Sequence, residues 1–428
     1  MTADESGAGT MKSGLRIAAA SSGLALLLLA GCSGGTGGDK GGAEVELRVD
    51  KPVALADEPV RIQVTGLDAG QEVTVTAQAA DYRDQQWNGQ ATFTADRTGA
   101  VDLTRDRPRS GTYQKADGMG LFWSMKPESG VADQSWFIAK PPEHQPGYEV
   151  HLAVNADGKQ IAAHRLTRTW MREGVTHRPL TMAEDGVRGS LYLPPTGAAR
   201  RPPVLSFGGS EGGLGDKFSP ALLASRGHPV LALCYFGCDE RPKTLSGIKL
   251  EYFATAARLL NREHGSGSQR PHVIGASRGS EAAQLLAHYY PDLVQDVVAY
   301  APSHKTNTGF PRNDAAWTKD GKAVKHAPIP LQRVRGTVLA IAGGADGLWP
   351  AAPSAEEIGK QKGASGGRHR ALIYPQAGHG VSTPPYTALA RSFKHPLNGV
   401  TYHMGGTPAA DAHARSDSWP QVLSLLQD

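Results

Sequence analysis

The second half of the chain alternates short apolar stretches with longer amphipathic ones, and this pattern limits the folds open to it. From about Val187 onward, stretches such as "PVLSF" (203–207), "PVLALCY" (229–235) and "DVVAY" (296–300) are almost entirely apolar. Runs of this length are typical of strands buried on both faces, and the segments between them have the length and periodicity of helices. Strands that alternate with helices predict a mostly parallel sheet covered by helices on both faces.

Residues 44–170 follow another pattern, in which apolar and polar residues alternate over short stretches. The segment "EVTVTA" (72–77) places an apolar side chain at every second position. Asp157 and Gly158 form a turn signal between two such arms, as in a β-hairpin. Many short alternating strands predict an all-β sandwich over residues 44–170, followed by an α/β domain over residues 171–428.

One stretch of the sandwich region lacks this alternation. It contains Met119, Leu121, Phe122, Trp123 and Met125 with almost no polar residue between them. We interpret it as a buried strand of the sandwich. The alternative is that it lines a pocket for an acyl chain at the junction of the two domains.

The beginning of the chain has the features of an export signal. Lys12 and Arg16 precede an apolar stretch over residues 17–30, which is too short for a lasting membrane span. The stretch ends in Leu-Ala-Gly-Cys, which is similar to a bacterial lipobox and predicts cleavage before Cys32 and lipidation of its thiol. We therefore expect residues 1–32 to be a lipoprotein signal peptide.

Residues 33–43 are rich in glycine and have no apolar periodicity, so we expect a flexible tether. The protein would then be exported and anchored by lipid to the outer face of a bacterial cell membrane. An uncleaved anchor is the alternative, and it would also place the protein outside the cytoplasm.

Cys234 and Cys238 are the thiols that remain if Cys32 carries lipid. An oxidising compartment permits a disulfide between them, but closing so small a ring demands a particular backbone geometry. They could equally be unrelated thiols, one ending a buried strand and one in a loop. No second Cys or His pair lies near them in the sequence, so a metal site is not expected.

The charge of the chain excludes one class of partner. The formal net charge is +4 over 428 residues, and no block of Lys and Arg stands out. We therefore expect no nucleic-acid partner. No cofactor is expected either, and the sequence does not set the oligomeric state.

A Gly-x-Ser-x-Gly pentad, "GASRG" (275–279), is the strongest sign of chemistry. It follows an apolar run and precedes a helix-forming stretch, so Ser277 is expected at a strand-to-helix turn. Such a turn holds a nucleophile in a strained conformation, and Gly275 and Gly279 remove side chains that would clash.

A serine hydroxyl needs a base to take its proton and a carboxylate to orient that base. In α/β-hydrolases these partners follow the serine in the order acid, then histidine, each in a loop after a later strand. Asp346 follows the apolar run "TVLAIAGG", and His379 follows "RALIYP". We predict Ser277, Asp346 and His379 as a catalytic triad, because His304 and Asp314 do not follow strands at the right places in this order.

An oxyanion site needs two backbone N–H donors. The N–H of Arg278, directly after the nucleophile, is the first candidate. The second should come from the loop "FGGSEGG" (207–213), near Ser210 or Glu211. A phosphate-binding role for this loop is disfavoured, because no Gly-Lys-Ser/Thr follows it.

Several longer stretches are similar to one known family. They include "FGGSEGGLGDKFSPALLASRGHPVLALCYF", "RPKTLSGIKLEYF", "IGASRGSEAA", "YPQAGHGVSTPPY" and "GGTPAADAHARSDSW". They resemble the acyl-CoA thioester hydrolases and the bile acid-CoA:amino acid N-acyltransferases, over about Glu44 to the C-terminus. The resemblance implies an immunoglobulin-like sandwich followed by an α/β-hydrolase domain.

The resemblance also implies a reaction. The family's nucleophile, acid and base fall on Ser277, Asp346 and His379, and the serine nucleophile resembles the hydrolytic members rather than the amino-acid-conjugating ones, which typically use cysteine. The implied activity is acyl-CoA thioester hydrolysis, but an exported protein would rarely meet CoA. An extracellular ester, an acyl transfer reaction and a non-catalytic binding role therefore stay open. The Arg278 side chain could face an anionic substrate or serve a structural role, such as pairing with Glu281.

Overall fold

The computed structural model describes residues 44–264, 269–382 and 384–427. The predicted signal peptide, the lipidated Cys32 and the tether up to residue 43 lie outside the described residues. Within the described ranges, no helix has both the length and the apolar character that crossing a membrane requires.

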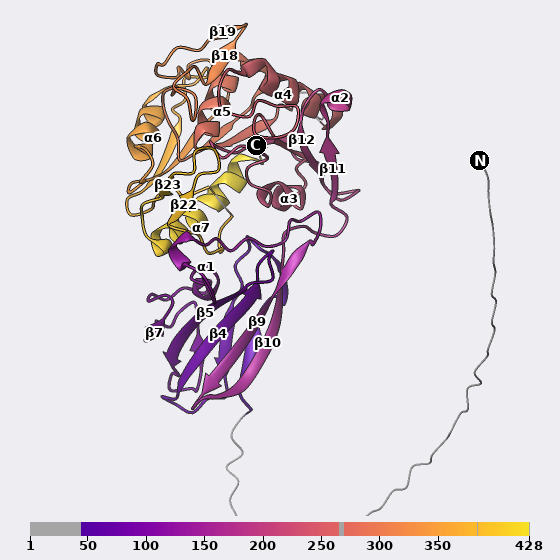
Figure 1. Ribbon diagram of the computed structural model, residues 1–428. Coiled ribbons are helices and arrows are strands. Elements are labelled where there is room, and N and C mark those ends of the chain that lie inside the picture. The colour runs from indigo at the N-terminus through magenta and orange to yellow at the C-terminus, as the bar shows by residue number, and fades with distance from the viewer. Residues whose placement is uncertain (1–43, 265–268, 383, 428) are drawn as a thin grey trace, which may run out of the picture. The chain divides into compact units, whose positions relative to one another are not determined.

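The N-terminal part forms two β-sheets, coloured indigo to magenta in Figure 1. The smaller sheet has the order β1-β3-β6, and the larger has the order β2-β10-β9-β4-β5-β7, with β8 also paired to β5. The strands of the smaller sheet are Glu46–Val49 (β1), Ile62–Thr65 (β3) and Val101–Asp102 (β6). Those of the larger are Val53–Leu55 (β2), Glu72–Ala80 (β4), Gln86–Thr94 (β5), Ser110–Gly111 (β7), Lys126–Pro127 (β8), Gly147–Ala156 (β9) and Lys159–Thr169 (β10).

The two sheets share one apolar core. Along β4 and β5, buried residues alternate with more exposed ones over almost the whole length. The buried side chains of both sheets, among them Ile62, Val75 and Phe93, join in a single cluster. Apolar and polar residues therefore alternate in the sequence because one face of each strand is buried in this shared core. The finer prediction of an immunoglobulin-like arrangement stays a prediction.

The apolar stretch from Met119 to Met125 is not a strand, so that prediction was wrong. Residues Gly120–Trp123 form a short helix, α1, that is buried on all sides. Asp117 holds its start, because its carboxylate accepts the Met119 N–H at 2.8 Å and the Trp123 indole N–H at 2.7 Å. A single buried helical turn shows no period of two, which explains the missing alternation. The stretch does not line the cavity at Ser277 either.

The C-terminal part is built on an eight-stranded sheet with the order β11-β12-β14-β13-β16-β17-β20-β21. Strand β12 runs antiparallel to both of its neighbours, and every other pair is parallel. This is the α/β sheet that the apolar runs predicted. Its strands are Thr176–Leu180 (β11), Gly189–Leu193 (β12), Val204–Phe207 (β13), Val230–Leu233 (β14), His272–Ala276 (β16), Val297–Tyr300 (β17), Val338–Gly343 (β20) and Arg370–Tyr374 (β21).

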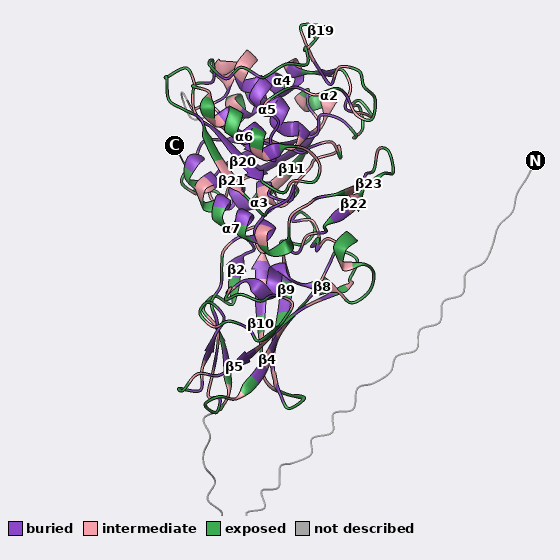
Figure 2. Ribbon diagram, turned by 90° about the vertical axis from the view of Figure 1, so that its left-hand side faces the viewer, coloured by how far each residue is buried: buried purple, intermediate pink, exposed green. Residues whose placement is uncertain are grey.

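Helices cover both faces of this sheet, and the strands are mostly buried (Figure 2). Successive residues of β17 show the two faces: Val297 joins one core cluster and Val298 the other. The first cluster contains residues of Leu250–His264 (α4), Arg278–Tyr289 (α5) and Ala351–Lys360 (α6). The second contains residues of Ser219–Ala224 (α3) and Pro408–Leu425 (α7). Strands buried on both faces explain why their sequences carry no alternation.

The remaining elements are short. They are the helix Met182–Asp185 (α2), the 3-10 turns Ala132–Gln134 (η1) and Pro291–Leu293 (η2), and the strands Ile248–Lys249 (β15), Trp317–Lys319 (β18), Lys322–Ala323 (β19), Ser392–Lys394 (β22) and Thr401–His403 (β23). The last helix, α7, begins directly after Thr407, which caps it and accepts the Ala410 N–H.

Buried polar contacts join the sandwich to the α/β part. The Asp57 carboxylate of the sandwich accepts the Trp419 indole N–H at 2.6 Å and pairs with Arg226 at 3.0 Å. Trp170 and Phe218 pack with ring centroids 4.4 Å apart. These contacts fix the sandwich against α3 and α7, which matters because the cavity described below has walls from both parts.

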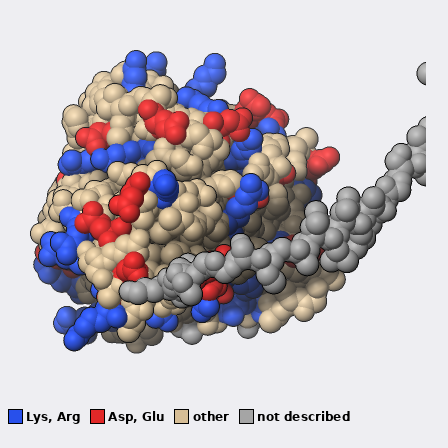
Figure 3. All heavy atoms as spheres, turned by 90° about the horizontal axis from the view of Figure 1, so that it is seen from below, with Lys and Arg blue, Asp and Glu red and all other residues tan. Residues whose placement is uncertain are grey.

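The surface at the sandwich end carries charge of both signs. Figure 3 views this end, where Lys and Arg side chains are interspersed with Asp and Glu. The face that is shown therefore presents mixed charge rather than a surface of a single sign.

Candidate active site

Ser277 lies at the turn between strand β16 and helix α5, where the pentad predicted it. Its backbone angles are φ 53° and ψ −120°, a conformation that a residue with a side chain rarely adopts. A Cβ at Gly275 would collide with the backbone of Gly279, and a Cβ at Gly279 would collide with the backbone of Gly208. Glycine at both positions is therefore what allows this turn to form.

Asp346 and His379 follow strands β20 and β21, each in the loop at the carboxyl end of its strand. His379 Nδ1 and Asp346 Oδ2 form a hydrogen bond of 2.7 Å, and the two side chains are only 10% and 2% exposed. The second carboxylate oxygen accepts the Leu348 N–H at 2.8 Å. Because an ionised carboxylate only accepts, Nδ1 carries the proton and His379 Nε2 is left as a base.

The register of the sheet brings these residues to Ser277. Strands β16, β17, β20 and β21 are parallel neighbours, so their carboxyl ends lie at one edge. Ser277 and His379 line the same cavity at this edge. Among the described residues the two side chains share no hydrogen bond. In unliganded hydrolases such bonds are often long and tighten when substrate binds, so the arrangement is compatible with proton transfer.

The predicted oxyanion donors lie on both sides of Ser277. Arg278 is the first residue of α5, and the first N–H groups of a helix have no partner within the helix. On the other side, a Cβ at Gly209 would lie 2.9 Å from Ser277 Cβ, so the loop after β13 lies directly against the nucleophile. The Gly209 N–H itself donates to Glu211 Oε1 at 2.8 Å. The N–H of Ser210 stays the better candidate for the second donor.

The Arg278 side chain turns away from the cavity. Its guanidinium donates to Glu281 Oε1 at 2.7 Å and to the Asn307 carbonyl at 3.2 Å. Glu281 is fully buried and also accepts the Trp317 indole N–H at 2.8 Å. The sequence left two roles open for this side chain, contact with an anionic substrate or a structural role. In the structure the side chain pairs with Glu281.

The two alternative catalytic residues lie elsewhere. His304 Nδ1 lies 3.1 Å from the hydroxyl of Ser354, and Asp314 accepts a hydrogen bond from Ser246. Neither His304 nor Asp314 lines the cavity that contains Ser277.

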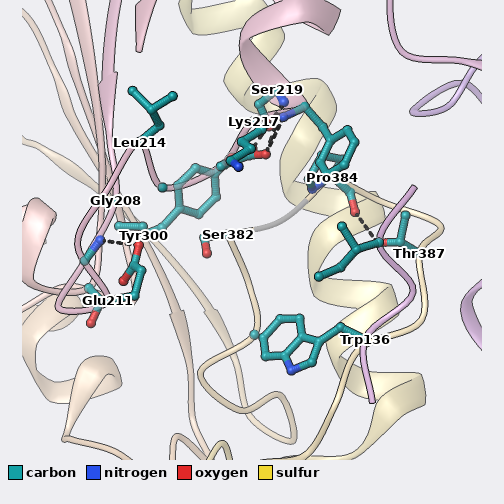
Figure 4. Close-up of a pocket in the computed structure, with 18 of the residues that line it drawn as sticks. Trp136, Gly208, Glu211, Leu214, Lys217, Ser219, Tyr300, Ser382, Pro384 and Thr387 are labelled. Carbon is teal, nitrogen blue, oxygen red and sulfur yellow. Dashed lines mark hydrogen bonds between the residues drawn. The ribbon is translucent and has the colours of Figure 1, made fainter. Parts of the chain in front are cut away.

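A cavity of about 630 Å³ opens at Ser277 between the sandwich and the α/β part (Figure 4). Its walls are mainly apolar and aromatic, and the sandwich supplies one of them. The sandwich side consists of Tyr82, Trp136, Phe137, Ile138, Ala139, Pro141 and Trp170. The α/β side includes Leu214, Phe218, Leu223, Tyr300, Leu389, Phe393, Met404 and Trp419. The sequence did not single out these residues, because they come from loops, helices and strands that are far apart in the chain.

Few charged residues line this cavity. They are Glu211, Asp216 and Lys217, all on the loop between β13 and α3. Burial raises the pKa of the Glu211 and Asp216 carboxyl groups. Among the described residues, no group of three or more His, Cys, Asp or Glu side chains is arranged to hold a metal ion.

A second histidine contacts the oxyanion loop. His395 Nε2 lies 3.0 Å from Ser210 Oγ, and His395 Nδ1 accepts the Leu397 N–H at 3.2 Å. Because Nδ1 accepts, Nε2 carries the proton and donates to Ser210. Ser210 is therefore held by its side chain, which leaves its backbone in a fixed position beside Ser277.

The structure joins Cys234 and Cys238 in a disulfide directly after β14. The short ring contains Phe236, whose carbonyl accepts the Gly213 N–H at 2.9 Å. Tyr235 also donates to the carbonyls of Gly208 and Gly209. The disulfide therefore lies next to the contacts that support the loop after β13.

Two family models match the chain. The model for the acyl-CoA thioester hydrolase/BAAT N-terminal region matches residues 57–182. The model for the BAAT/acyl-CoA thioester hydrolase C-terminal region matches residues 304–428, which include Asp346 and His379. Ser277 lies between the two matched regions.

Curated relatives cover almost the whole chain. Human acyl-coenzyme A thioesterase 1 is 31% identical over 400 residues, which are 86% of this chain and 93% of the relative. Acyl-coenzyme A amino acid N-acyltransferase 1 of Mus musculus is 30% identical over 405 residues, 87% of this chain and 95% of the relative. A solved dienelactone hydrolase-like promiscuous phosphotriesterase from metagenomic libraries aligns with a TM-score of 0.37 and 16% identity, over 59% of this chain and 98% of its own.

Proposed function

The chain belongs to the acyl-CoA thioester hydrolase and bile acid-CoA:amino acid N-acyltransferase family, and we propose that it is a serine hydrolase that cleaves an acyl thioester or ester. The relatives named as acyl-CoA thioesterases support a hydrolytic reaction. The observation that carries the serine mechanism is the His379–Asp346 hydrogen bond at the edge of the cavity that Ser277 lines.

In the first half of the reaction, Ser277 Oγ attacks the acyl carbonyl carbon while His379 Nε2 takes the hydroxyl proton. Asp346 keeps the imidazole in the required tautomer and stabilises the imidazolium that forms. The N–H groups of Arg278 and Ser210 stabilise the oxyanion. The carbon–leaving group bond then breaks, and the leaving group takes the proton from His379.

In the second half, a water molecule attacks the acyl-enzyme while His379 Nε2 takes one of its protons. The bond between Ser277 Oγ and the acyl carbon breaks, and the serine regains its proton from His379. The acyl product leaves as a free acid. In an acyltransferase an acceptor other than water would attack at this step, which is why hydrolysis and transfer share the first half of the reaction.

The cavity supports an apolar acyl group. Its wall on the sandwich side contains Trp136, Phe137 and Ile138, which offer apolar surface to an acyl chain. The sandwich would thus help to select the substrate, although it carries none of the proposed catalytic side chains.

Two classes of substrate, which differ in their leaving group, are candidates for this enzyme. The names of the relatives favour acyl-CoA. An ester or thioester outside the cell is the alternative, because the predicted signal peptide would place the enzyme where CoA is scarce. Among the described residues that line the cavity, Lys217 is the only Lys or Arg, which favours a leaving group with fewer charges than CoA.

A fluorophosphonate probe tests the serine mechanism. We expect the probe to label the full-length protein and expect the label to be absent from Ser277→Ala. Ser206→Ala, which changes another serine of the same cavity, is the matched control and should label normally. Labelling that survives in Ser277→Ala would refute the assignment, and no labelling of any variant would favour a non-catalytic binding protein.

A substrate panel then separates the two leaving groups. Nitrophenyl esters and acyl-CoA thioesters with the same acyl groups should be compared by kcat/KM. Higher values for the CoA series would support an acyl-CoA thioesterase, and higher values for the esters would support an extracellular esterase.

We also propose the exported, lipid-anchored location. Cells that express the protein should transfer radioactive palmitate to it, and Cys32→Ser should abolish the transfer. Retention of the label in that variant would contradict lipidation at Cys32.

A further inference from the structure

The Glu211 side chain turns back along its own loop, and its carboxylate lies beside the nucleophile. Oε1 accepts the Gly209 N–H at 2.8 Å. A Cβ added at Gly209 would lie 2.9 Å from Glu211 Oε2 and 2.9 Å from Ser277 Cβ. Glu211 Oε2 and Ser277 Cβ therefore lie close to each other, next to Gly209. The mechanism above uses the backbone here and leaves this carboxylate without a role.

Titratable and charged groups face this part of the cavity from several elements. They are His379 after β21, His395 after β22, and Asp216 and Lys217 on the same loop as Glu211. Tyr235 after β14 also interacts with Glu211 but does not line the cavity. The Arg278 side chain at the start of α5 turns away from the cavity. Arg278 is paired with Glu281. Lys217 is exposed, and within the described part of the chain no ion pair includes Glu211. Among the described residues, the Glu211 carboxylate therefore has no cationic partner at bonding distance.

We propose that Glu211 is a specificity-determining residue that keeps anionic groups away from Ser277 and so favours release of the carboxylate product. This inference rests on the proposed hydrolysis. The acid that leaves Ser277 gives its proton to water at neutral pH, since carboxyl groups ordinarily titrate near pH 4. The product and Glu211 then carry like charges, which repel each other.

The effect should depend on pH. Desolvation by the surrounding protein raises the pKa of Glu211, so the group gains its charge at a higher pH than a carboxyl group in free solution. The exclusion of anions should therefore strengthen as the pH rises through that pKa. The substrate carbonyl is neutral and escapes this repulsion, whereas its carboxylate product does not.

A purely structural role is the competing explanation. In that role Glu211 would only close the turn through the Gly209 N–H, and its charge would not matter. Glu211→Gln separates the two, because glutamine keeps an oxygen that can accept the Gly209 N–H but carries no charge.

The experiment compares two ligands of nearly the same shape, octanoate and octanamide, in the full-length protein. Their dissociation constants should be measured by calorimetry between pH 6 and pH 9, where octanoate is ionised throughout. We expect Glu211→Gln to bind octanoate about tenfold more tightly than the native protein at the upper end of this range, with octanamide unchanged. The matched control is Glu149→Gln on the exposed side of β9, which should bind both ligands like the native protein.

Two outcomes would overturn the proposal. In one, Glu211→Gln changes the binding of both ligands by the same factor, which a structural role predicts. In the other, it changes neither. If Glu211→Gln does not fold, Glu211→Ala should show the same gain for octanoate alone. Because calorimetry needs no turnover, a failure of the proposed hydrolysis would appear separately, as missing fluorophosphonate labelling of Ser277.

Discussion

Two histidine–aspartate pairs lie at opposite edges of the same sheet, and their surroundings differ. At the carboxyl edge, His379 and Asp346 share an aligned hydrogen bond of 2.7 Å, and the imidazole borders the cavity at Ser277. At the amino edge, His272 Nδ1 lies 3.0 Å from Asp296 Oδ2 without the alignment of a hydrogen bond. The second pair lies in the protein interior, where the exposed fraction of the His272 side chain is 0%.

The difference teaches that the chemical groups alone do not make a catalytic pair. A histidine can act as a base only if one nitrogen is oriented by a partner and the other faces a reacting group. His379 meets the first condition, because Asp346 orients its Nδ1, and it borders the cavity that Ser277 also lines. The proposed reaction requires that it meets the second. At the amino edge, His272 and Asp296 lie where the strands begin inside the core. Because neither residue lines the cavity at Ser277, we expect this pair to affect only the stability of the protein.

Ser277→Ala should give the largest effect at the carboxyl edge. Removal of the nucleophile should lower kcat/KM for a nitrophenyl ester by about 10⁴-fold or more. Rates should be measured beside Ser206→Ala, which lines the same cavity and should keep most of its activity. A similar loss in both variants would mean that damage to the cavity, rather than lost chemistry, explains the result.

Matched asparagine variants should separate the two edges. Asp346→Asn should lower kcat by about 10⁴-fold, because the imidazole loses its required tautomer, with little change in stability. Asp296→Asn should leave kcat within about twofold and lower the free energy of unfolding by about 1–3 kcal/mol, since Asp296 also accepts the partly buried Thr337 N–H at 2.6 Å. Steady-state kinetics and urea unfolding measure both quantities, and the reverse pattern would refute the comparison.

The amino edge should also control stability against acid. Burial lowers the pKa of His228, just before β14, to about 4 from an ordinary value of 6.5. His228 therefore binds a proton below about pH 6.5 in the unfolded chain, but only below about pH 4 in the folded protein. The free energy of unfolding therefore falls as the pH drops from about 6.5 to about 4. The expected loss is about 3 kcal/mol. His228→Gln should lose less stability between pH 7 and pH 4, and an equal loss in urea unfolding would contradict this origin.

The smallest expected effect concerns the sandwich wall of the cavity. Trp136→Ala should lower kcat/KM for long-chain nitrophenyl esters by about tenfold and leave acetyl esters nearly unchanged, because only a long chain reaches this wall. Val131→Ala, at an exposed residue that does not line the cavity, is the control. An equal loss for short and long esters would mean that Trp136 supports the fold and does not bind the chain.

Part of this architecture could be predicted from the sequence because it depends on local patterns. Apolar runs located the strands of the α/β sheet, and the pentad located Ser277 at a strand-to-helix turn. The prediction failed from Met119 to Met125, because an apolar stretch without alternation fits a buried strand and a buried helical turn equally well. The partner of Arg278 was left open for a similar reason, since Glu281 and a substrate offer the guanidinium the same charge.

The sequence by itself determined the two kinds of strand, the elbow at Ser277 and the order of Asp346 and His379, because spacing along the chain encodes them. Only the tertiary structure decided which walls enclose the cavity, that Asp346 meets His379, and that the Glu211 carboxylate lies near Ser277. Those contacts join residues far apart in the chain or depend on how one side chain turns. The register of the sheet and the packing of the sandwich against the sheet determine these contacts. Neither can be predicted from a short stretch of sequence.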